Sequence, residues 1–330
     1  MRFYTTCPPS SAYAAADYAA RVAQVSRWSE EAGAEGMLIY TDNGLADPWT
    51  VAGTVLAQTE RLVPLVAVQP VYHSPYAIAK TIASLALLHG RRVALNMVAG
   101  GFVRDLAALG DVTEHDDRYA RLEEYTTLIL ALLRGQRVEV EGRWYSLGGV
   151  ELRPEMPNGL LPEVFLSGSS EAGIATGLSL GATPVCYPPP PDRIEGPAIP
   201  GRIARIGLIA RNTDDEAWAL AHGRFPADPR GAMTHKLAMA TSDSVWHRQL
   251  ADLGATLKGE AQAAYWLHPM ETYRTFCPYL VGSHDRIAAM LSQYAALGFE
   301  GLILDVPATQ DDLEHTAKVL ELAERTPVPA

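Results

Sequence analysis

Three small polar residues, Gly168, Ser169 and Ser170, follow the apolar stretch 163–167 and precede a helical pattern over 170–180. At the start of a helix several backbone N–H groups have no partner within the helix, and the helix dipole adds a partial positive charge. Such a turn suits an anion, and the two hydroxyls can add hydrogen bonds. It therefore predicts a phosphate site, with simple helix capping as the alternative.

Two histidines and an arginine are candidates for chemistry on a substrate. His73 follows the apolar stretch 63–68, and His268 lies in a long segment between two predicted strands. Both are candidate acid–base groups, because histidine is the natural proton carrier near neutral pH. A structural role is the alternative for each histidine. Arg205 could act on an anionic substrate, and the alternative for it is an ion pair at the end of a strand.

The elements that must position these residues alternate between strand and helix, which predicts parallel strands joined by crossover helices. The pattern indicates a (β/α)8 barrel of one domain spanning 1–330, with insertions after strands 4 and 7, and sites in such barrels form at the C-terminal ends of the strands. The predicted strands are 2–6, 36–40, 63–68, 93–98, 163–167, 183–187, 203–210 and 301–305. The predicted helices are 14–32, 48–58, 75–89, 116–134, 170–180, 214–223, 285–296 and 311–325.

Local features refine this pattern. Asp47 before Pro48 predicts an N-cap followed by a first-turn proline, and Thr113 and Asp116 have capping-box spacing. Residues 137–147 predict a β-hairpin that turns at Glu141-Gly142. The proline-rich stretch 188–201 replaces a crossover helix, because proline cannot continue one. The long segment 224–282 is typical of an active-site wall or lid.

Composition limits the class of protein. The chain has 330 residues, a formal net charge of −11 and 48% hydrophobic residues. A nucleic-acid partner is not expected, because a phosphate backbone requires a cationic surface. No signal peptide or membrane span is expected either. Three scattered cysteines indicate buried thiols in a reducing, cytoplasmic setting rather than metal ligands.

Several ordered motifs resemble those of the luciferase-like flavin-dependent monooxygenases, in particular the alkanesulfonate monooxygenase branch. They cover nearly the whole chain and are RRVALNMVAGG (91–101), GDVTEHDDRYARLEEY (110–125), FLSGSSEAG (165–173), ARNTDDEAW (210–218) and LVGSHDRIAAMLSQYAALGFEGLIL (280–304). The resemblance implies that the 168–170 turn holds the phosphate of FMN and that Tyr119 reaches in from the long fourth loop. It also implies that Gln69, Asn96 and Val98 flank the isoalloxazine ring.

The resemblance also implies the cofactor cycle. The chain has no Gly-x-Gly-x-x-Gly after its first strand, so it is not expected to reduce its own flavin efficiently. Related enzymes receive reduced FMN from a separate NAD(P)H:flavin reductase and use O2 to oxygenate a small molecule. A homodimer or homotetramer is expected.

The match fails at the substrate end. Alkanesulfonate monooxygenases contact their substrate through a Cys, a His, and a Tyr and His pair. In this chain the aligned residues are Leu45 for the Cys, Gly207 for the first His, and Pro307 and Thr309 for the pair. Their Trp after the sixth strand becomes Tyr187, while one Arg aligns with Arg205 and another with Arg274. We therefore expect the oxygenase chemistry without the simple alkanesulfonate substrate, and Tyr187, Arg205 and Arg274 as substrate contacts.

Two other functions remain open from the sequence. A deazaflavin-dependent oxidoreductase of the same superfamily would transfer hydride without oxygen. A flavin-binding protein without turnover would explain the missing substrate residues. The sequence does not name the substrate or assign the acid–base group.

Overall fold

The computed structural model describes residues 1–330 apart from 101, 197, 199, 240–244, 258–263 and 326–330. Eight parallel strands form a closed barrel in the order β1-β13-β9-β8-β7-β4-β3-β2, which confirms the predicted (β/α)8 class. The chain consists of two compact units, one of residues 1–6, 31–35 and 185–330 and one of residues 7–30 and 36–184. The single domain over 1–330 stays a prediction.

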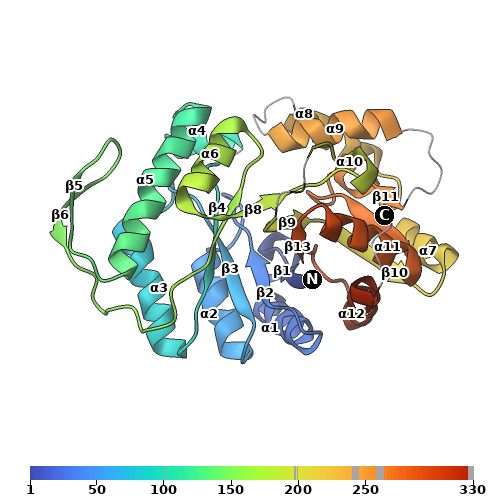
Figure 1. Ribbon diagram of the computed structural model, residues 1–330, viewed down its shortest axis with the longest axis horizontal. Helices are drawn as coiled ribbons and strands as arrows, with labels where there is room; N and C mark the ends of the chain where they lie inside the picture. The colour runs from blue at the N-terminus through green and yellow to red at the C-terminus, as the bar shows by residue number, and fades with distance from the viewer. Residues whose placement is uncertain (101, 197, 199, 240–244, 258–263, 326–330) are drawn as a thin grey trace. The chain divides into compact units, whose positions relative to one another are not determined.

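The unit of residues 7–30 and 36–184 holds the first βα repeats. Its strands are β2 (Gly36–Ile39), β3 (Val63–Val68), β4 (Ala94–Met97) and β7 (Val164–Ser167), and β8 (Thr183–Cys186) begins in it. Its helices are η1 (Ser10–Ala12), α1 (Ala15–Glu31), α2 (Pro48–Gln58), α3 (Pro75–His89), α4 (Val103–Ala108), α5 (His115–Leu133) and α6 (Glu171–Leu180). Helix α5 packs against both α3 and α6 (Figure 1).

The predicted hairpin is present as the antiparallel pair β5 (Val138–Glu141) and β6 (Ser146–Val150). Its turn is held by Glu124 of α5, whose carboxylate accepts hydrogen bonds from the backbone N–H groups of Trp144 and Tyr145. The hairpin is thereby tied to the helix that carries Tyr119.

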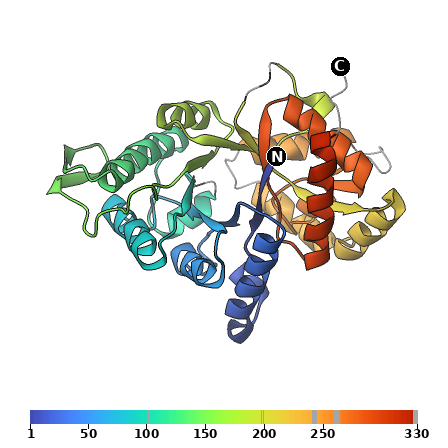
Figure 2. The same ribbon diagram turned by 60° about the horizontal axis from the view of Figure 1, so that its bottom comes forward.

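The strands of the other unit belong to two sheets, the barrel and a separate three-stranded sheet. The barrel strands are β1 (Arg2–Thr6), β9 (Arg202–Arg205) and β13 (Phe299–Ile303), and a second sheet consists of β10 (Gly207–Arg211), β12 (Tyr279–Ser283) and β11 (Tyr265–Trp266). Its helices are η2 (Pro191–Arg193), α7 (Asp214–Arg224), α8 (Pro229–Met239), α9 (Val245–Leu257), α10 (His268–Glu271), α11 (His284–Ala296) and α12 (Gln310–Arg325). Helices α11 and α12 lie side by side (Figure 2).

The single strand expected over 203–210 is wrong. The chain leaves the barrel at Ile206. Before this residue β9 pairs with the barrel strand β13, and after it β10 pairs with β12 of the second sheet. The backbone N–H of Ile206 still donates to Ile303 in the barrel, but that of Gly207 donates to Pro278 beside the second sheet. One continuous apolar stretch thus serves two sheets.

Local capping explains several helix starts. Asp47 accepts a hydrogen bond from Thr50 N at 2.9 Å with Pro48 in the first turn, as predicted. The capping box at Thr113 is wrong, because Thr113 Oγ1 donates instead to Asp111 and Glu114 is the N-cap of α5. Over the described part of 188–201 only a short 3₁₀ turn is helical, so the absence of a crossover helix there is confirmed.

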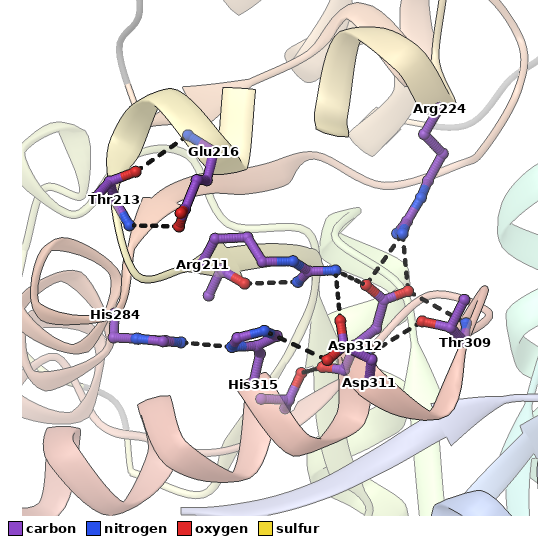
Figure 3. Close-up of polar contacts among 11 residues, drawn as sticks. Arg211, Thr213, Glu216, Arg224, His284, Thr309, Asp311, Asp312 and His315 are labelled. Atoms are coloured by element: carbon purple, nitrogen blue, oxygen red, sulfur yellow. Dashed lines mark hydrogen bonds and ion pairs between the residues drawn. The ribbon is translucent and has the colours of Figure 1, made fainter. Parts of the chain in front are cut away.

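A buried carboxylate fixes the start of α12 (Figure 3). Asp312 is bound by Arg211 and by Arg224, each at 2.8 Å, and its backbone N–H and side chain exchange hydrogen bonds with Thr309. Burial acts to raise the pKa of Asp312, but Arg224 and Arg211 lower it below its usual value. Thr309, expected from the alignment near the substrate, thus serves as a helix cap in this arrangement.

Candidate active site

The predicted phosphate turn lies between β7 and α6. Ser170 is the N-cap of α6, and its hydroxyl accepts the Gly173 N–H at 3.1 Å. The Oγ atom of Ser169 is buried and has no hydrogen-bond partner among the described residues. The sequence allowed either serine to cap the helix, and in the structure Ser170 is the residue that does so. A buried hydroxyl without a partner costs free energy unless a ligand supplies the bond.

Tyr119 of α5 closes one side of this turn. A Cβ atom added at Gly168 would lie 2.8 Å from Tyr119 Oη, and one at Gly173 would lie 3.0 Å from Tyr119 Cε1. Real Cβ atoms essentially never lie within 3.0 Å of another heavy atom, so a side chain at Gly168 would force Tyr119 to shift, and one at Gly173 would meet Tyr119 in an unusually tight contact. The structure thus brings Tyr119 and the turn together, and their role in binding a phosphate stays a prediction.

This arrangement fits the phosphate of FMN. The N-terminus of α6 supplies a partial positive charge, and Ser169 supplies a hydroxyl that no described protein group uses. Tyr119 adds a phenolic hydroxyl directly beside Gly168. Bound FMN would therefore be held by the turn, by the unpartnered serine and by the tyrosine.

The residues predicted to flank the flavin ring lie at the ends of neighbouring strands. Asn96 of β4 is buried, and its Oδ1 accepts a hydrogen bond from Ser167 at 2.9 Å. Val98 continues β4 by donating its N–H to Val68 O, and Gln69 donates to Thr41 O at 3.4 Å. Ser167 was missed by the sequence reasoning, although its place at the end of β7, beside β4, was a usable signal.

A cavity of about 440 Å³ opens at the C-terminal ends of β2 and β3. Gln69 and His73 both line it, and so does Leu45, which the sequence resemblance aligns with a cysteine of the alkanesulfonate monooxygenases. His73 itself is exposed. Ligand sites commonly have this size and combine apolar walls with a few polar groups.

Arg205 is at the C-terminal end of β9 and is 6% exposed. Its Nη2 lies 3.3 Å from Asp305 Oδ1, and Asp305 Oδ2 accepts hydrogen bonds from Thr275 at 2.5 Å and Tyr279 at 2.8 Å. Arg205 therefore forms the ion pair at the end of a strand that the sequence analysis gave as the alternative to a role on the substrate. Asp305, Thr275 and Tyr279 were not singled out from the sequence, because only the fold brings them to Arg205.

Tyr187 belongs to the surroundings of Arg205. Burial raises the pKa of Tyr187 to about 12, and the positive charge of Arg205 partly opposes this rise. Burial likewise raises the pKa of the neighbouring Cys277 thiol to about 12. Both groups are neutral at physiological pH, so neither is a proton acceptor there.

Gly207 is the position that the sequence resemblance aligns with a histidine of the alkanesulfonate monooxygenases. A Cβ atom at this position would lie 2.3 Å from the ring of Tyr279, so the tyrosine occupies the space of any larger side chain. Tyr279 in turn donates to Asp305. The absence of a side chain at Gly207 thus leaves room for the Tyr279 ring, whose hydroxyl donates to Asp305.

Arg274 and His268 make contacts of their own in the same unit as Arg205. Arg274 is 54% exposed, and its Nη2 forms an ion pair with Asp228 Oδ2 at 2.7 Å. His268 begins α10 and stacks on Trp266 with ring centroids 5.4 Å apart. The predicted residues therefore form two groups: Gln69, His73, Asn96, Val98, Tyr119 and the turn in one unit, and Tyr187 with Arg205 in the other.

The described residues also show three features that concern membranes, metal ions and disulfides. Within the described residues, no helix is long and apolar enough to cross a membrane. Among the same residues no group of His, Cys, Asp or Glu could hold a metal ion. The three cysteines form no disulfide.

Comparison with known proteins establishes the class. Residues 1–301 match the model of the luciferase-like monooxygenase family, and the chain belongs to this family. A curated relative, the 4-(gamma-L-glutamylamino)butanoyl-[BtrI acyl-carrier protein] monooxygenase BtrO of Niallia circulans, is 34% identical over 309 residues, which cover 90% of this chain and 89% of the relative.

Solved structures show the same fold. EDTA monooxygenase from Chelativorans sp. BNC1 has a TM-score of 0.75 at 16% identity and covers 100% of this chain and 95% of its own. The oxygenating constituent of 3,6-diketocamphane monooxygenase from Pseudomonas putida, in complex with FMN, has a TM-score of 0.71 at 16% identity, covering 100% and 99%. The prediction of a flavin-dependent monooxygenase that oxygenates a small organic substrate is confirmed.

Proposed function

We propose that this chain is the oxygenase of a two-component system that receives reduced FMN from a separate NAD(P)H:flavin reductase. The observation that carries the proposal is the phosphate turn, where the buried Ser169 hydroxyl has no protein partner among the described residues and Tyr119 lies against Gly168. A reductase partner is needed because the chain has no dinucleotide-binding fingerprint after its first strand.

We infer that the substrate is an acyl group carried on an acyl-carrier protein. Support comes from the relative with 34% identity, whose printed name gives an acyl-carrier-protein-bound substrate with a glutamylamino group. An acyl substrate is also favoured over a simple alkanesulfonate by the residues aligned with the sulfonate site, which are Leu45, Gly207, Pro307 and Thr309. The chain nevertheless keeps the ordered motifs of the alkanesulfonate monooxygenase-like branch, and we assign it there.

The protein residues have distinct proposed roles. Bound reduced FMN supplies the electrons that activate O2. The α6 N-terminus, Ser169 and Tyr119 hold the phosphate, while Asn96, Val98 and Gln69 flank the ring. Ser167 fixes the Asn96 side chain by donating to its Oδ1, which leaves the amide nitrogen as the donor.

Proton transfer and substrate contacts complete the proposal. His73 is the favoured acid–base group, because it lines the cavity beside Gln69. Arg205 and Tyr187 are retained as substrate contacts. His268 and Arg274 stay predictions, and we propose a cytoplasmic homodimer or homotetramer of one luciferase-like domain.

The test supplies the purified enzyme with FMN, NADH, a flavin reductase and acyl groups on an acyl-carrier protein under 18O2. We expect substrate-dependent oxygen uptake and one labelled oxygen atom in the acyl product. Oxygen uptake that yields only hydrogen peroxide with every acyl group would contradict an oxygenase for this substrate class. Turnover with a deazaflavin cofactor but not with reduced FMN would instead support the hydride-transfer alternative.

A further inference from the structure

The cavity at the ends of β2 and β3 has an apolar floor and an acidic wall. Leu45, Trp49, Ala67 and Leu109 provide apolar surface, whereas Asp42 and Asp47 provide carboxylates. Among the described residues no lysine or arginine lines it, and the one basic side chain that does is that of His73. The fixed charge of the cavity wall is therefore negative.

Asp42 is available to a ligand. Its Oδ1 accepts the backbone N–H of Gly44 at 2.7 Å, and within the described part of the chain no basic side chain forms an ion pair with it. Asp47 differs, because its carboxylate already accepts both the N–H and the hydroxyl of Thr50 as the cap of α2. Of the two carboxylates, Asp42 keeps more of its accepting capacity.

The loop that carries Asp42 is held in place by its neighbours. Tyr72 donates to Asn43 Oδ1 at 2.8 Å, and Asn43 Nδ2 donates to the backbone oxygen of Asp105 at 2.9 Å. Burial and the charge of Asp42 raise the pKa of Asp105. Burial and the charges of Asp105 and Asp42 raise the pKa of Tyr72. Burial is the larger cause of both rises, and the negative charge of Asp42 adds to each of them.

A protonated amine fits such a wall better than other small groups. An ammonium group offers three donors and the charge opposite to that of Asp42, whereas a carboxylate would meet like charge in a partly desolvated space. A neutral alkyl end would use the apolar floor but leave Asp42 without a counter-ion. Gln69, proposed to flank the flavin, also lines the cavity, so a group bound there belongs to the substrate region.

We propose that this cavity binds a protonated amino group of the acyl substrate, with Asp42 as its counter-ion. The inference rests on the proposed function and adds the chemical class of the substrate end distant from the thioester.

The test uses three thioesters of N-acetylcysteamine with chains of equal length: 6-aminohexanoyl, hexanoyl and adipoyl. Their affinities for the FMN-loaded enzyme are measured by calorimetry. We expect the cationic probe to bind about tenfold or more tightly than the neutral one, the scale of hydrogen bonds to a charged group, and the anionic probe to bind most weakly. In Asp42→Asn the cationic preference should fall to within about twofold, with the hexanoyl affinity unchanged.

Controls separate a local charge effect from structural damage. Asp42→Asn keeps an oxygen for the Gly44 N–H, and Asp17→Asn removes an exposed carboxylate of α1 that is not part of the cavity lining. Equal affinity of the wild-type enzyme for the cationic and neutral probes would overturn the inference. So would an Asp42→Asn variant that loses all three probes equally, or one that loses FMN.

Binding and turnover are scored separately. Cationic selectivity abolished by Asp42→Asn supports the inference even if none of the thioesters is oxygenated, in which case the proposed reaction alone fails. Oxygenation of all three probes without charge preference supports the reaction and overturns the inference.

Discussion

Tyr119 lies so close to Gly168 that a Cβ atom on the glycine would be 2.8 Å from the tyrosine oxygen. Gly168→Ala should therefore displace Tyr119 and distort the phosphate turn. Overpacking typically costs about 1–3 kcal/mol, so we expect FMN affinity to fall about tenfold, measured by fluorescence titration. Gly177→Ala is the matched control, because its Cβ would meet only Leu166 at 3.9 Å, and FMN binding should be unchanged.

A double substitution gives a further check. In a Tyr119→Phe background the atom nearest to the new methyl group is absent, so Gly168→Ala should cost less affinity there than in the wild-type chain. Equal costs in both backgrounds would show that the tyrosine contact is not the reason for the glycine.

The two serines of the turn should respond differently to alanine. Ser169→Ala removes a hydroxyl without a described protein partner and should lower FMN affinity by about 1.5–3 kcal/mol with little loss of apo-protein stability. Ser170→Ala removes the cap of α6 and should lower the free energy of unfolding by about 1 kcal/mol. FMN titration and urea unfolding of each variant measure both effects, and unchanged FMN affinity in Ser169→Ala would refute the phosphate assignment.

Simple alkanesulfonates should yield little or no sulfite, even with reduced FMN supplied. Leu45 and Pro307 cannot hydrogen-bond through their side chains, and Tyr279 fills the space of a residue larger than Gly207. The loss of a positioned proton-transfer group typically reduces a rate by about 10²–10⁴. Sulfite release at rates of about 1 s⁻¹, within the ordinary enzyme range, would show that another group has taken over this work.

The two candidate arginines should contribute very differently to stability. Asp305→Asn leaves the buried Arg205 charge without its counter-ion, and breaking such a pair typically costs about 3–5 kcal/mol. Arg274→Ala breaks an ion pair at the surface, which should leave the urea midpoint almost unchanged. Similar midpoints for the two variants would contradict the assignment of Arg205 to a buried pair.

Stability should decrease in mildly acidic solution because of His284, whose Nε2 lies 2.7 Å from His315 Nδ1 (Figure 3). Burial, Lys318, His315 and Arg211 lower the pKa of His284 and outweigh Asp285. The unfolded chain therefore binds this proton more tightly, so the free energy of unfolding falls as the pH drops through about 6.5 and below. Urea unfolding from pH 7.5 to 5 measures the slope, which should flatten in His284→Asn; an identical slope in the variant would exclude this histidine as its cause.

The sequence predicted those elements whose determinants are local. Asp47 and Pro48 fix the start of α2, and the predicted range 48–58 is the observed one. The strand 203–210 was mispredicted because its division at Ile206 depends on two partners far away in sequence, β13 and β12. Apolar periodicity carries no information about which sheet a strand joins.

The candidate site shows the same limit. The motif around 168–170 predicts an anion turn, but it does not distinguish the capping Ser170 from the unpartnered Ser169. Thr113 and Asp116 have the spacing of a capping box, yet Asp111 competes successfully for the threonine hydroxyl. Asp305 went unnoticed because its partners come from two other segments, Arg205 from one and Thr275 and Tyr279 from the other, and only the folded chain shows that Arg205 is paired.

The pairing of β1 with β13 has a consequence for synthesis on the ribosome. Arg2 lies in register with Gly301, and Leu304 N–H donates to Tyr4 O, so β1 cannot pair with β13 until the whole chain between Thr6 and Phe299 has been made. At about 5–20 residues per second, β1 waits roughly 15–60 s for that partner. During this time one edge of a nascent apolar strand is open to other chains. Expression yield should therefore depend on chaperones that bind early segments more than on the stability of the finished barrel.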